Sequence, residues 1–257
     1  MENKKSLLVA LPVYNEKKDL PKNFPRIHAF LTKHLAHIDW HIVIAEQASS
    51  DNTLAIAKRL ATEYPHVSWL HRDQKGRGGA LKQAWRENNA DFLSYMDIDL
   101  ATRLEHFPQL IAALEQGDDI AIGSRLNTNS VVENRSFIRE SSSRAFNLFL
   151  RLLFGVRFQD AQCGFKALRR ETFLALMPSI KSDGWIFDTE LLIMAEKAGF
   201  RINVIPVHWR DDPDRAGQAV LLKPYQEETT MSGIPTTTRL ALAAQTGHGA
   251  GRFVRAT

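Results

Sequence analysis

Two carboxylates, Asp97 and Asp99, lie one residue apart directly after the apolar run FLSYM of residues 92–96. Alternate residues at the end of a strand point to the same side, so both carboxylates can face one cation. Mg²⁺ and Mn²⁺ prefer oxygen ligands and commonly bridge one or two carboxylates to substrate phosphates. A metal bound in this way neutralises charge on a departing diphosphate. The position after a buried strand favours a site for Mg²⁺ or Mn²⁺ over a pair of solvated turn residues.

A glycine-rich turn, KGRGG at residues 75–79, precedes a predicted helix. Glycines allow backbone N–H groups to approach an anion, and the N-terminus of a helix attracts one. The spacing matches neither a dinucleotide fingerprint nor a P-loop. We interpret Lys75, Gly76 and Gly78 as contacts for a nucleotide, and a tight turn with two solvated cations is the alternative.

Further polar side chains follow other apolar runs. Glu46 and Asp51 flank a serine-rich turn and could accept hydrogen bonds from a base or from ribose hydroxyls, although Asp51 could equally be only a helix cap. Arg125 follows Ile-Gly-Ser and could meet a phosphate, with a surface arginine as the equal alternative. Asp188 and Glu190 lie two residues apart among apolar residues, where buried acids need either partners or a function.

The elements that must position these side chains are short apolar strands that alternate with helices. The predicted strands cover residues 7–13, 41–45, 67–71, 92–96 and 120–123. The predicted helices between them cover residues 22–36, 52–64, 78–88 and 104–115. Strands without polar alternation are covered on both faces, and this order predicts right-handed βαβ units in a mostly parallel α/β sheet flanked by helices. Ligands of such sheets bind at the carboxyl ends of the strands, where Glu46 and Asp97 lie.

The second half of the chain has a less regular pattern. Helices are predicted over residues 143–154 and 189–198, and a strand over residues 202–207. After residue 214 the sequence becomes rich in Thr, Gly, Ala and Gln, with weak periodicity. We expect one domain over residues 1–214 and an atypical, poorly ordered C-terminal tail over residues 215–257.

Composition limits the classes of partner. The 257 residues are 44% hydrophobic and 24% charged, which is typical of a globular chain with one large or two small domains. The net charge of +4 and the pI near 9.2 fit a partner that carries phosphates, and the excess is too small to indicate nucleic acid. The single cysteine, Cys163, excludes an intrachain disulfide and a cysteine-based metal cluster, and it suits a reducing cytosol.

Nine collinear stretches together resemble glycosyltransferase family 2, and within it the polyprenol-phosphate sugar synthases. They are LPVYNE (11–16), IVIAEQASSDNT (42–53), KGRGGAL (75–81), YMDIDL (95–100), IGSR (122–125), SRAFN (143–147), DAQCGFKALRRE (160–171), WIFDTELL (185–192) and IPVHW (205–209). Each stretch alone is weak, but the ordered set is specific to the family. The resemblance implies a single-domain GT-A fold that binds a nucleotide sugar, and an inverting transfer of a hexose from a GDP- or UDP-sugar to polyprenyl phosphate.

The resemblance also implies roles for residues by their position in these stretches. The nucleotide pocket would be lined by Pro12, Tyr14, Glu16, Glu46, Asp51 and Asp97. Asp97 and Asp99 would hold the sugar nucleotide and its metal, and Arg125 and Arg139 would meet the acceptor phosphate. The catalytic set would comprise Asp97, Asp99, Arg125, Asp188 and Glu190.

The chain departs from the family at three places. Glu46 stands where the family usually has Asp, which displaces contacts to the base by one methylene. Ala101 occupies a position where some mannose synthases have a metal-binding Gln. The resemblance stops after residues 211–214, and the expected Ser and basic helix are absent from the sequence that follows.

The acceptor decides which chemistry the protein must supply. A lipid phosphate has a second pKa near ~6 and is largely a dianion at neutral pH, so direct displacement at the anomeric carbon needs no strong general base. A sugar hydroxyl would require a carboxylate base, with Asp188 or Glu190 as the candidates. The alternatives are a family 2 transferase that acts on a polysaccharide or glycolipid hydroxyl, and a catalytically impaired nucleotide-binding homologue. A sugar nucleotidyltransferase would carry a glycine-rich loop where this chain has PVYNE at residues 12–16.

The apolar helix of residues 143–154 must be buried or touch lipid. Its only charges are Arg144 and Arg151, and an arginine stem can extend over apolar surface while its guanidinium meets phosphate. We expect this helix to hold the protein on the bilayer and Arg139 to guide the lipid phosphate inward, and a plain core helix is the alternative. No run reaches the roughly 18 apolar residues that cross a bilayer, so the expected location is cytoplasmic and peripheral, at the cytoplasmic face of a membrane.

Overall fold

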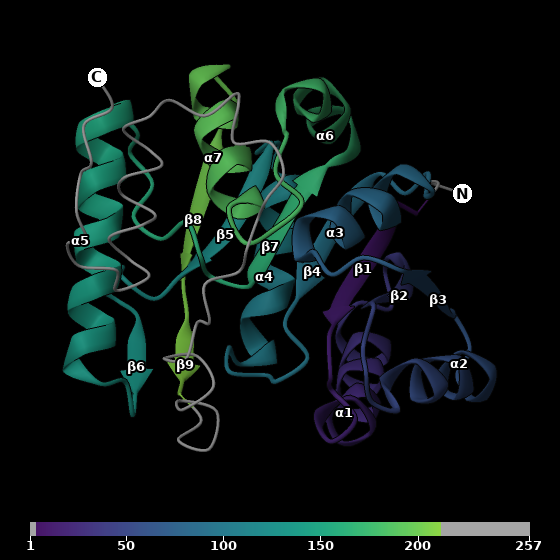
Figure 1. The fold of residues 1–257 in the computed structure, drawn as a ribbon. Coiled ribbons are helices and arrows are strands. Elements are labelled where there is room, and N and C mark those ends of the chain that lie inside the picture. The colour runs from purple at the N-terminus through teal and green to yellow at the C-terminus, as the bar shows by residue number, and fades with distance from the viewer. Residues whose placement is uncertain (1–3, 212–257) are drawn as a thin grey trace, which may run out of the picture.

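A central sheet of seven strands crosses the protein in the order β3-β2-β1-β4-β7-β5-β8 (Figure 1). The computed structural model describes residues 4–211. The strands of the sheet are β1 Ser6–Val13, β2 Asp39–Gln47, β3 Val67–Arg72, β4 Phe92–Met96, β5 Ile120–Ser124, β7 Phe165–Arg169 and β8 Ile202–Pro206. A second, two-stranded sheet pairs β6 Val131–Glu133 with β9 His208–Arg210. The helices are α1 Asp19–His34, α2 Thr53–Glu63, α3 Arg77–Arg86, η1 Leu104–His106, α4 Phe107–Glu115, α5 Phe137–Phe154, α6 Arg170–Leu176, η2 Met177–Ser179 and α7 Phe187–Lys197.

The large sheet is mostly parallel, which confirms the prediction. β1 pairs in parallel with β2 and β4, β2 with β3, and β5 with β8. β7 is the exception, because it runs antiparallel to both β4 and β5. The sequence pattern does not predict β7, because its five residues, FKALR, form a very short apolar run that contains Lys166. The loops that follow β1 to β5 therefore share one edge of the sheet.

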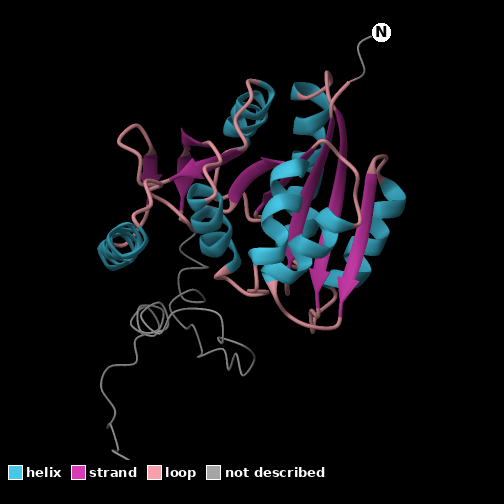
Figure 2. Cartoon of the chain, turned by 90° about the horizontal axis from the view of Figure 1, so that it is seen from above, coloured by secondary structure: helices cyan, strands magenta, loops and turns pink. Residues whose placement is uncertain are grey.

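Alternate residues of β1 belong to two different hydrophobic cores. Leu7, Val9 and Leu11 join residues of α1, α2 and α4 in one core. Leu8 and Ala10 join residues of α3, α6 and α7 in the other. Figure 2 shows helices on both sides of the strands. Because both faces are covered, the strand needs no polar alternation, and its unbroken apolar run identifies it from sequence.

Helix α5 is longer than its apolar pattern predicts. It begins at Phe137, well before the predicted start at residue 143, because Ser136 caps it by accepting a hydrogen bond from the backbone N–H of Arg139. It ends at Phe154, as predicted, where Gly155 adopts the left-handed conformation with φ 67°. The segment that the cap adds, residues 137–142, extends the helix toward β6.

Two sequence-based expectations concern the limits of the domain. The predicted tail of residues 215–257 lies outside the described residues, as do residues 212–214 of the predicted domain. Within the part of the chain that the structure describes, no helix combines the length and apolarity needed to cross a bilayer.

Candidate active site

The carboxylates of Asp97 and Asp99 lie in the loop that follows β4, at the carboxyl edge of the sheet. The Asp97 side chain is 39% exposed, and its backbone N–H donates to the carbonyl of Gly164 at 3.2 Å. Asp99 accepts a hydrogen bond from the backbone N–H of Ala101 at 3.0 Å, which holds the turn that follows. The pair predicted from sequence is therefore at the edge where ligands of α/β sheets bind.

Arg77, the first residue of α3, is the cation beside this pair. Its Nη2 lies 2.8 Å from Oδ1 of Asp97, and its Nε lies 4.0 Å from Oδ2 of Asp188. The guanidinium is buried between the rings of Tyr95 and Trp185, 4.9 Å from each ring centroid. Burial lowers the pKa of Arg77, but Asp97 and the other nearby acids raise it above its ordinary value, so the side chain stays charged. The sequence places Arg77 in a glycine-rich turn but cannot reveal this burial, because Trp185 comes from a distant loop.

Negative charge is crowded around Asp97. The pKa of Asp97 is raised to about 6, and desolvation is the largest cause. Arg77 acts against this rise, and the carboxylates of Asp99 and Asp188 add to it. Among residues 4–211, no group of three or more His, Cys, Asp or Glu side chains could hold a metal ion. Two carboxylates nevertheless fit Mg²⁺ or Mn²⁺, which often bind proteins through one or two carboxylates and complete their shell with substrate phosphates and water.

Asp188 belongs to a buried polar network beneath this site. Its Oδ1 accepts a hydrogen bond from the Tyr95 hydroxyl and lies 3.1 Å from Nζ of Lys166. Lys166 also donates to the Tyr95 hydroxyl at 2.9 Å and to the carbonyl of Cys163 at 2.6 Å. Burial, followed by the charge of Asp188, raises the pKa of Tyr95 well above its ordinary value, so the phenol keeps its proton. Asp188 is thus held by fixed donors, and sequence reasoning missed both Lys166 and Tyr95 because they look like ordinary strand residues.

Glu190 has a different set of contacts. Its two carboxylate oxygens accept backbone hydrogen bonds from Lys181 at 3.0 Å and from Ser182 at 2.8 Å. These bonds hold the loop before α7, which carries Trp185 to Arg77. The structure therefore connects Glu190 to the loop, and its predicted catalytic role stays a prediction.

The loops after β1 and β2 are joined into one wall of the site. The backbone N–H of Asn15 donates to Oγ of Ser49 at 2.9 Å, and Oδ1 of Asn15 accepts from the backbone N–H of Ser50 at 2.9 Å. The backbone N–H of Glu16 donates to Oγ1 of Thr53 at 2.8 Å. The structure thus brings together two segments that the sequence assigns to one nucleotide pocket.

Both predicted acids of the second loop are engaged with neighbouring groups. Oδ1 of Asp51 accepts from the backbone N–H of Thr53 at 2.9 Å, a turn contact two residues along the chain, and the N-cap of α2 is Asn52 rather than Asp51. Glu46 is fully buried; its Oε1 accepts from the backbone N–H of Ser49 at 2.6 Å, and its Oε2 bonds Nδ1 of His71. The hydrogen bond to Glu46 raises the pKa of His71, although desolvation opposes it. Contacts of Glu46 and Asp51 with a nucleotide remain predictions.

Pro12, Tyr14 and Lys75 also gather at this edge. Pro12 is buried in β1, opposite Ala45 of β2. Nζ of Lys75 lies 3.9 Å from the centroid of the Tyr14 ring, so a cation–π contact links the loop after β1 to the turn before α3. Tyr14 and Lys75, which the sequence assigns to the nucleotide site from two separate segments, therefore lie in contact.

The glycine-rich turn is packed more tightly than a phosphate cradle requires. The backbone N–H of Gly76 donates to Oε1 of Gln47 at 3.1 Å, within the protein. A Cβ atom at position 76 would lie 2.8 Å from the carbonyl oxygen of Asp183, and one at position 78 would collide with the side chain of Phe187. These glycines allow α3 to pack closely against α7 and the loop before it. Close packing therefore explains these two glycines without a ligand, and their predicted contacts with a phosphate stay predictions.

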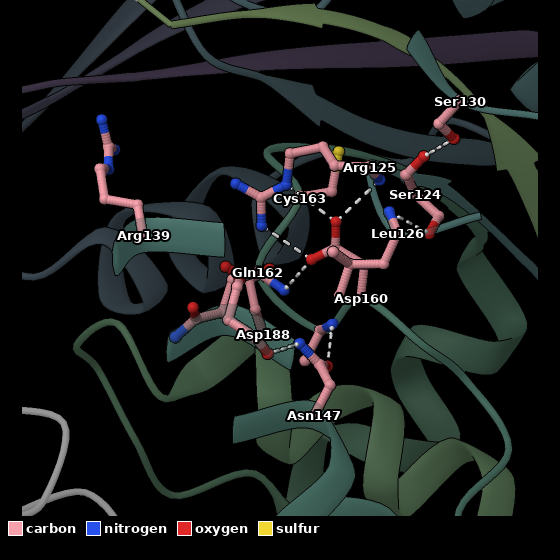
Figure 3. Close-up of polar contacts among 12 residues, drawn as sticks. Ser124, Arg125, Leu126, Ser130, Arg139, Asn147, Asp160, Gln162, Cys163 and Asp188 are labelled. Carbon is pink, nitrogen blue, oxygen red and sulfur yellow. Dashed lines mark hydrogen bonds and ion pairs between the residues drawn. The ribbon is translucent and has the colours of Figure 1, made fainter. Parts of the chain in front are cut away.

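The two arginines predicted for an acceptor phosphate are each paired with a carboxylate. Arg125 binds Asp160 through Nε to Oδ2 at 2.8 Å and Nη2 to Oδ1 at 2.7 Å. Arg139, in the first turn of α5, pairs with Asp211. Figure 3 shows the Arg139 side chain apart from the Arg125–Asp160 pair, directed away from it. The structure therefore does not bring the two guanidinium groups together, and sequence reasoning missed Asp160 as the partner of Arg125.

The fold is that of the GT-A glycosyltransferases. It resembles glucosyl-3-phosphoglycerate synthase from Mycobacterium tuberculosis, solved in complex with Mn²⁺, UDP and phosphoglyceric acid, with a TM-score of 0.61 at 17% identity. The likeness covers 96% of this chain and 80% of that one.

Residues 8–176 match the family model described as Glycosyl transferase family 2, and the chain belongs to this family. It is 38% identical over 208 residues to Glycosyltransferase AglD of Haloferax volcanii, and the aligned region covers 80% of this chain and 33% of that protein. It is 33% identical over 220 residues to a dolichyl-phosphate beta-glucosyltransferase of Drosophila melanogaster, with 80% and 67% covered. The chain thus spans about a third of the length of AglD.

Proposed function

We propose that this chain transfers a hexose from a GDP- or UDP-sugar to a polyprenyl phosphate, with inversion at the anomeric carbon. Two observations support the reaction class: the similarity to a dolichyl-phosphate beta-glucosyltransferase, and the paired carboxylates Asp97 and Asp99 at the carboxyl edge of the sheet. The dolichyl-phosphate of that relative is a polyprenyl-type lipid phosphate, which is the acceptor class proposed here.

The contacts of Asp188 and Glu190, the two candidate bases, are the reason for proposing a phosphate acceptor. Asp188 is buried and bound by Lys166 and Tyr95, and Glu190 holds the loop before α7. A sugar hydroxyl needs a base to take its proton, whereas a lipid phosphate with a second pKa near ~6 is already a nucleophilic dianion. Engaged carboxylates at positions 188 and 190 therefore favour the acceptor that needs no base.

The remaining residues have roles in positioning and charge. Asp97 and Asp99 would hold Mg²⁺ or Mn²⁺, which supplies charge neutralisation for the leaving diphosphate when bound. Arg77 keeps the Asp97 carboxylate in place through its 2.8 Å ion pair and adds a fixed positive charge next to it. Arg125 would meet the acceptor phosphate with N–H groups beyond the two that bind Asp160, since a guanidinium has five.

The proposed location follows from the acceptor. A polyprenyl phosphate stays in a bilayer, so the protein must reach the membrane surface to use it. We place it peripherally at the cytoplasmic face, in agreement with its mild basicity and single buried cysteine.

The test compares acceptors with a panel of donors. Purified full-length chain with Mn²⁺ is incubated with UDP-glucose or GDP-mannose, and with dolichyl phosphate or a glycolipid that offers only hydroxyl groups. We expect a labelled, lipid-linked sugar from dolichyl phosphate and none from the glycolipid. Transfer to the glycolipid alone would establish the hydroxyl-acceptor alternative. Donor binding by calorimetry without any transfer would establish the impaired nucleotide-binding homologue.

A further inference from the structure

Helix α5 presents two unlike faces. Ser143, Phe146, Asn147 and Leu150 are buried against the body of the protein. The opposite side is apolar and open to solvent. We define the outer face of α5 as Phe137 (83% exposed), Ile138 (77%), Leu148 (53%) and Leu152 (79%). The helix is therefore only partly buried, which does not fit the plain core helix, and the expectation that it holds the protein on a bilayer stays a prediction.

The outer face extends along the helix, with the half-buried Ser141 as a polar residue between Phe137 and Ala145. Residues three, four and seven apart share one side of a helix, and the exposed Ala145 lies between Ile138 and Leu148 on that side. Figure 1 shows α5 at the outer edge of the molecule, with β6 next to one of its ends. Large apolar side chains exposed together on one element mark an interaction surface, because monomeric proteins rarely expose large contiguous apolar patches.

Arg144 and Arg151 lie along one margin of the outer face. They are seven residues apart and therefore on one side of the helix. Arg144 remains 61% exposed while it pairs with Glu140 at 2.6 Å, and Arg151 is exposed. An apolar centre with an arginine margin matches the boundary between acyl chains and anionic headgroups, where arginine stems cover hydrocarbon and guanidinium groups meet phosphate.

We propose that the outer face of α5 is the docking surface of this protein for an anionic lipid bilayer. This inference rests on the proposed function, because a polyprenyl phosphate acceptor resides in a membrane. A second copy of the chain fits the face poorly. Antiparallel two-fold pairing of α5 would bring Arg144 of each copy close to Arg151 of the other, and like charges oppose such an interface.

The structure links the docking helix to the carboxylate pair through one short strand. Arg139, in the first turn of α5, pairs with Asp211 directly after β9. The backbone N–H of Arg210, in β9, donates to the carbonyl of Ala101 at 2.8 Å, two residues after Asp99. A docked α5 would therefore be connected through β9 to the loop that carries Asp99.

Flotation with vesicles tests the surface. The full-length chain is compared with the double variant Leu148→Asp/Leu152→Asp and with Leu174→Asp, a matched control because Leu174 of α6 is 50% exposed. On phosphatidylcholine–phosphatidylglycerol vesicles we expect at least about tenfold weaker binding by the double variant and no change in the control. Arg144→Gln/Arg151→Gln should weaken binding to these vesicles by about fivefold for each arginine and leave binding to neutral vesicles unchanged.

Two outcomes would overturn the docking surface. One is equal vesicle binding by wild type and the double variant, or no binding by the wild type. The other is a wild-type dimer in sedimentation that the double variant converts to a monomer without any effect on vesicles. Unaltered unfolding temperatures of all variants confirm that the fold is intact.

Activity on two acceptors separates this inference from the proposed function. The double variant should keep transfer to a short, water-soluble isoprenyl phosphate and lose most transfer to dolichyl phosphate in vesicles. Full transfer to both acceptors would overturn docking and leave the proposed function standing. Absence of transfer to either acceptor by the wild type, with α5-dependent vesicle binding, would overturn the proposed function and leave docking standing.

Discussion

The carboxylate of Asp97 occupies the space in which a side chain at position 164 would lie. A Cβ atom on Gly164 would overlap Oδ2 of Asp97, and the Gly164 carbonyl accepts the Asp97 backbone N–H at 3.2 Å. The loop before β7 therefore sets the position of the first carboxylate of the pair. A glycine remote in sequence is thus part of the candidate site.

Gly164→Ala should displace the Asp97 carboxylate and reduce transfer by about a hundredfold, because displacements near 1 Å have effects of this size. Far-ultraviolet circular dichroism should show an unchanged fold. Gly155→Asn is the control: no atom lies within 4 Å of a Cβ at Gly155, and Asn tolerates its left-handed conformation. Wild-type activity of Gly164→Ala would show that Asp97 need not occupy this position.

Asp99→Asn should reduce transfer by at least about a hundredfold while the fold stays intact, because the metal would lose one of two carboxylates. Removal of divalent ions with EDTA should have the same effect on the wild type. A thermal shift with Mn²⁺, seen in the wild type and absent in the variant, would measure the metal directly. Full activity of Asp99→Asn in metal-free buffer is the result that contradicts the metal site.

Gly78→Val tests whether the glycine-rich turn serves packing or binding. The new side chain would collide with Phe187, so we expect a loss of about 1–3 kcal/mol in the free energy of unfolding, measured with urea. Nucleotide affinity of the folded fraction, measured by calorimetry, should change little. A variant with wild-type stability and weak nucleotide binding would instead support the phosphate cradle.

Lys166→Met should destabilise the protein by about 3–5 kcal/mol, because it removes a buried cation and leaves the Asp188 carboxylate with fewer partners. Adding Asp188→Asn to this variant should recover part of the loss, since the uncompensated charge is then removed. Urea unfolding of the two single variants and the double variant gives the coupling energy. Strictly additive losses would show that Lys166 and Asp188 do not act as a pair.

The Glu46–His71 hydrogen bond predicts a pH-dependent stability. Glu46 raises the pKa of His71 in the folded state. The pair therefore contributes fully to the free energy of unfolding at pH values below the pKa of His71 in the unfolded chain, near ~6.5. This contribution is lost as the pH rises through the higher folded pKa. His71→Ala should therefore be destabilised relative to the wild type more at pH 6 than at pH 9 in urea unfolding. An equal difference at both pH values would show that His71 contributes no charge.

Local sequence determines β1 to β5 and β8, their order along the chain and the edge that carries the polar residues. β1 and β4 are recognisable because strands covered on both faces are unbroken apolar runs, and this pattern needs no knowledge of distant contacts. Parallel connections then place the Asp97–Asp99 pair and the loop at Glu46 on one edge. These features depend on periodicity, which any short window of sequence contains.

Tertiary structure alone decides which charged groups are paired. Lys166 and Tyr95 are 71 residues apart, and Arg125 and Asp160 are 35 apart, yet each pair is hydrogen-bonded. β7 carries the buried Lys166 between two strands that run the other way, a placement that five residues of mixed polarity do not predict. The same holds for α5, where packing decides that Phe146 is buried and Leu152 exposed although both are apolar. Burial and charge pairing are properties of segments brought together by the chain's overall path, so they are decided only when the whole domain is folded.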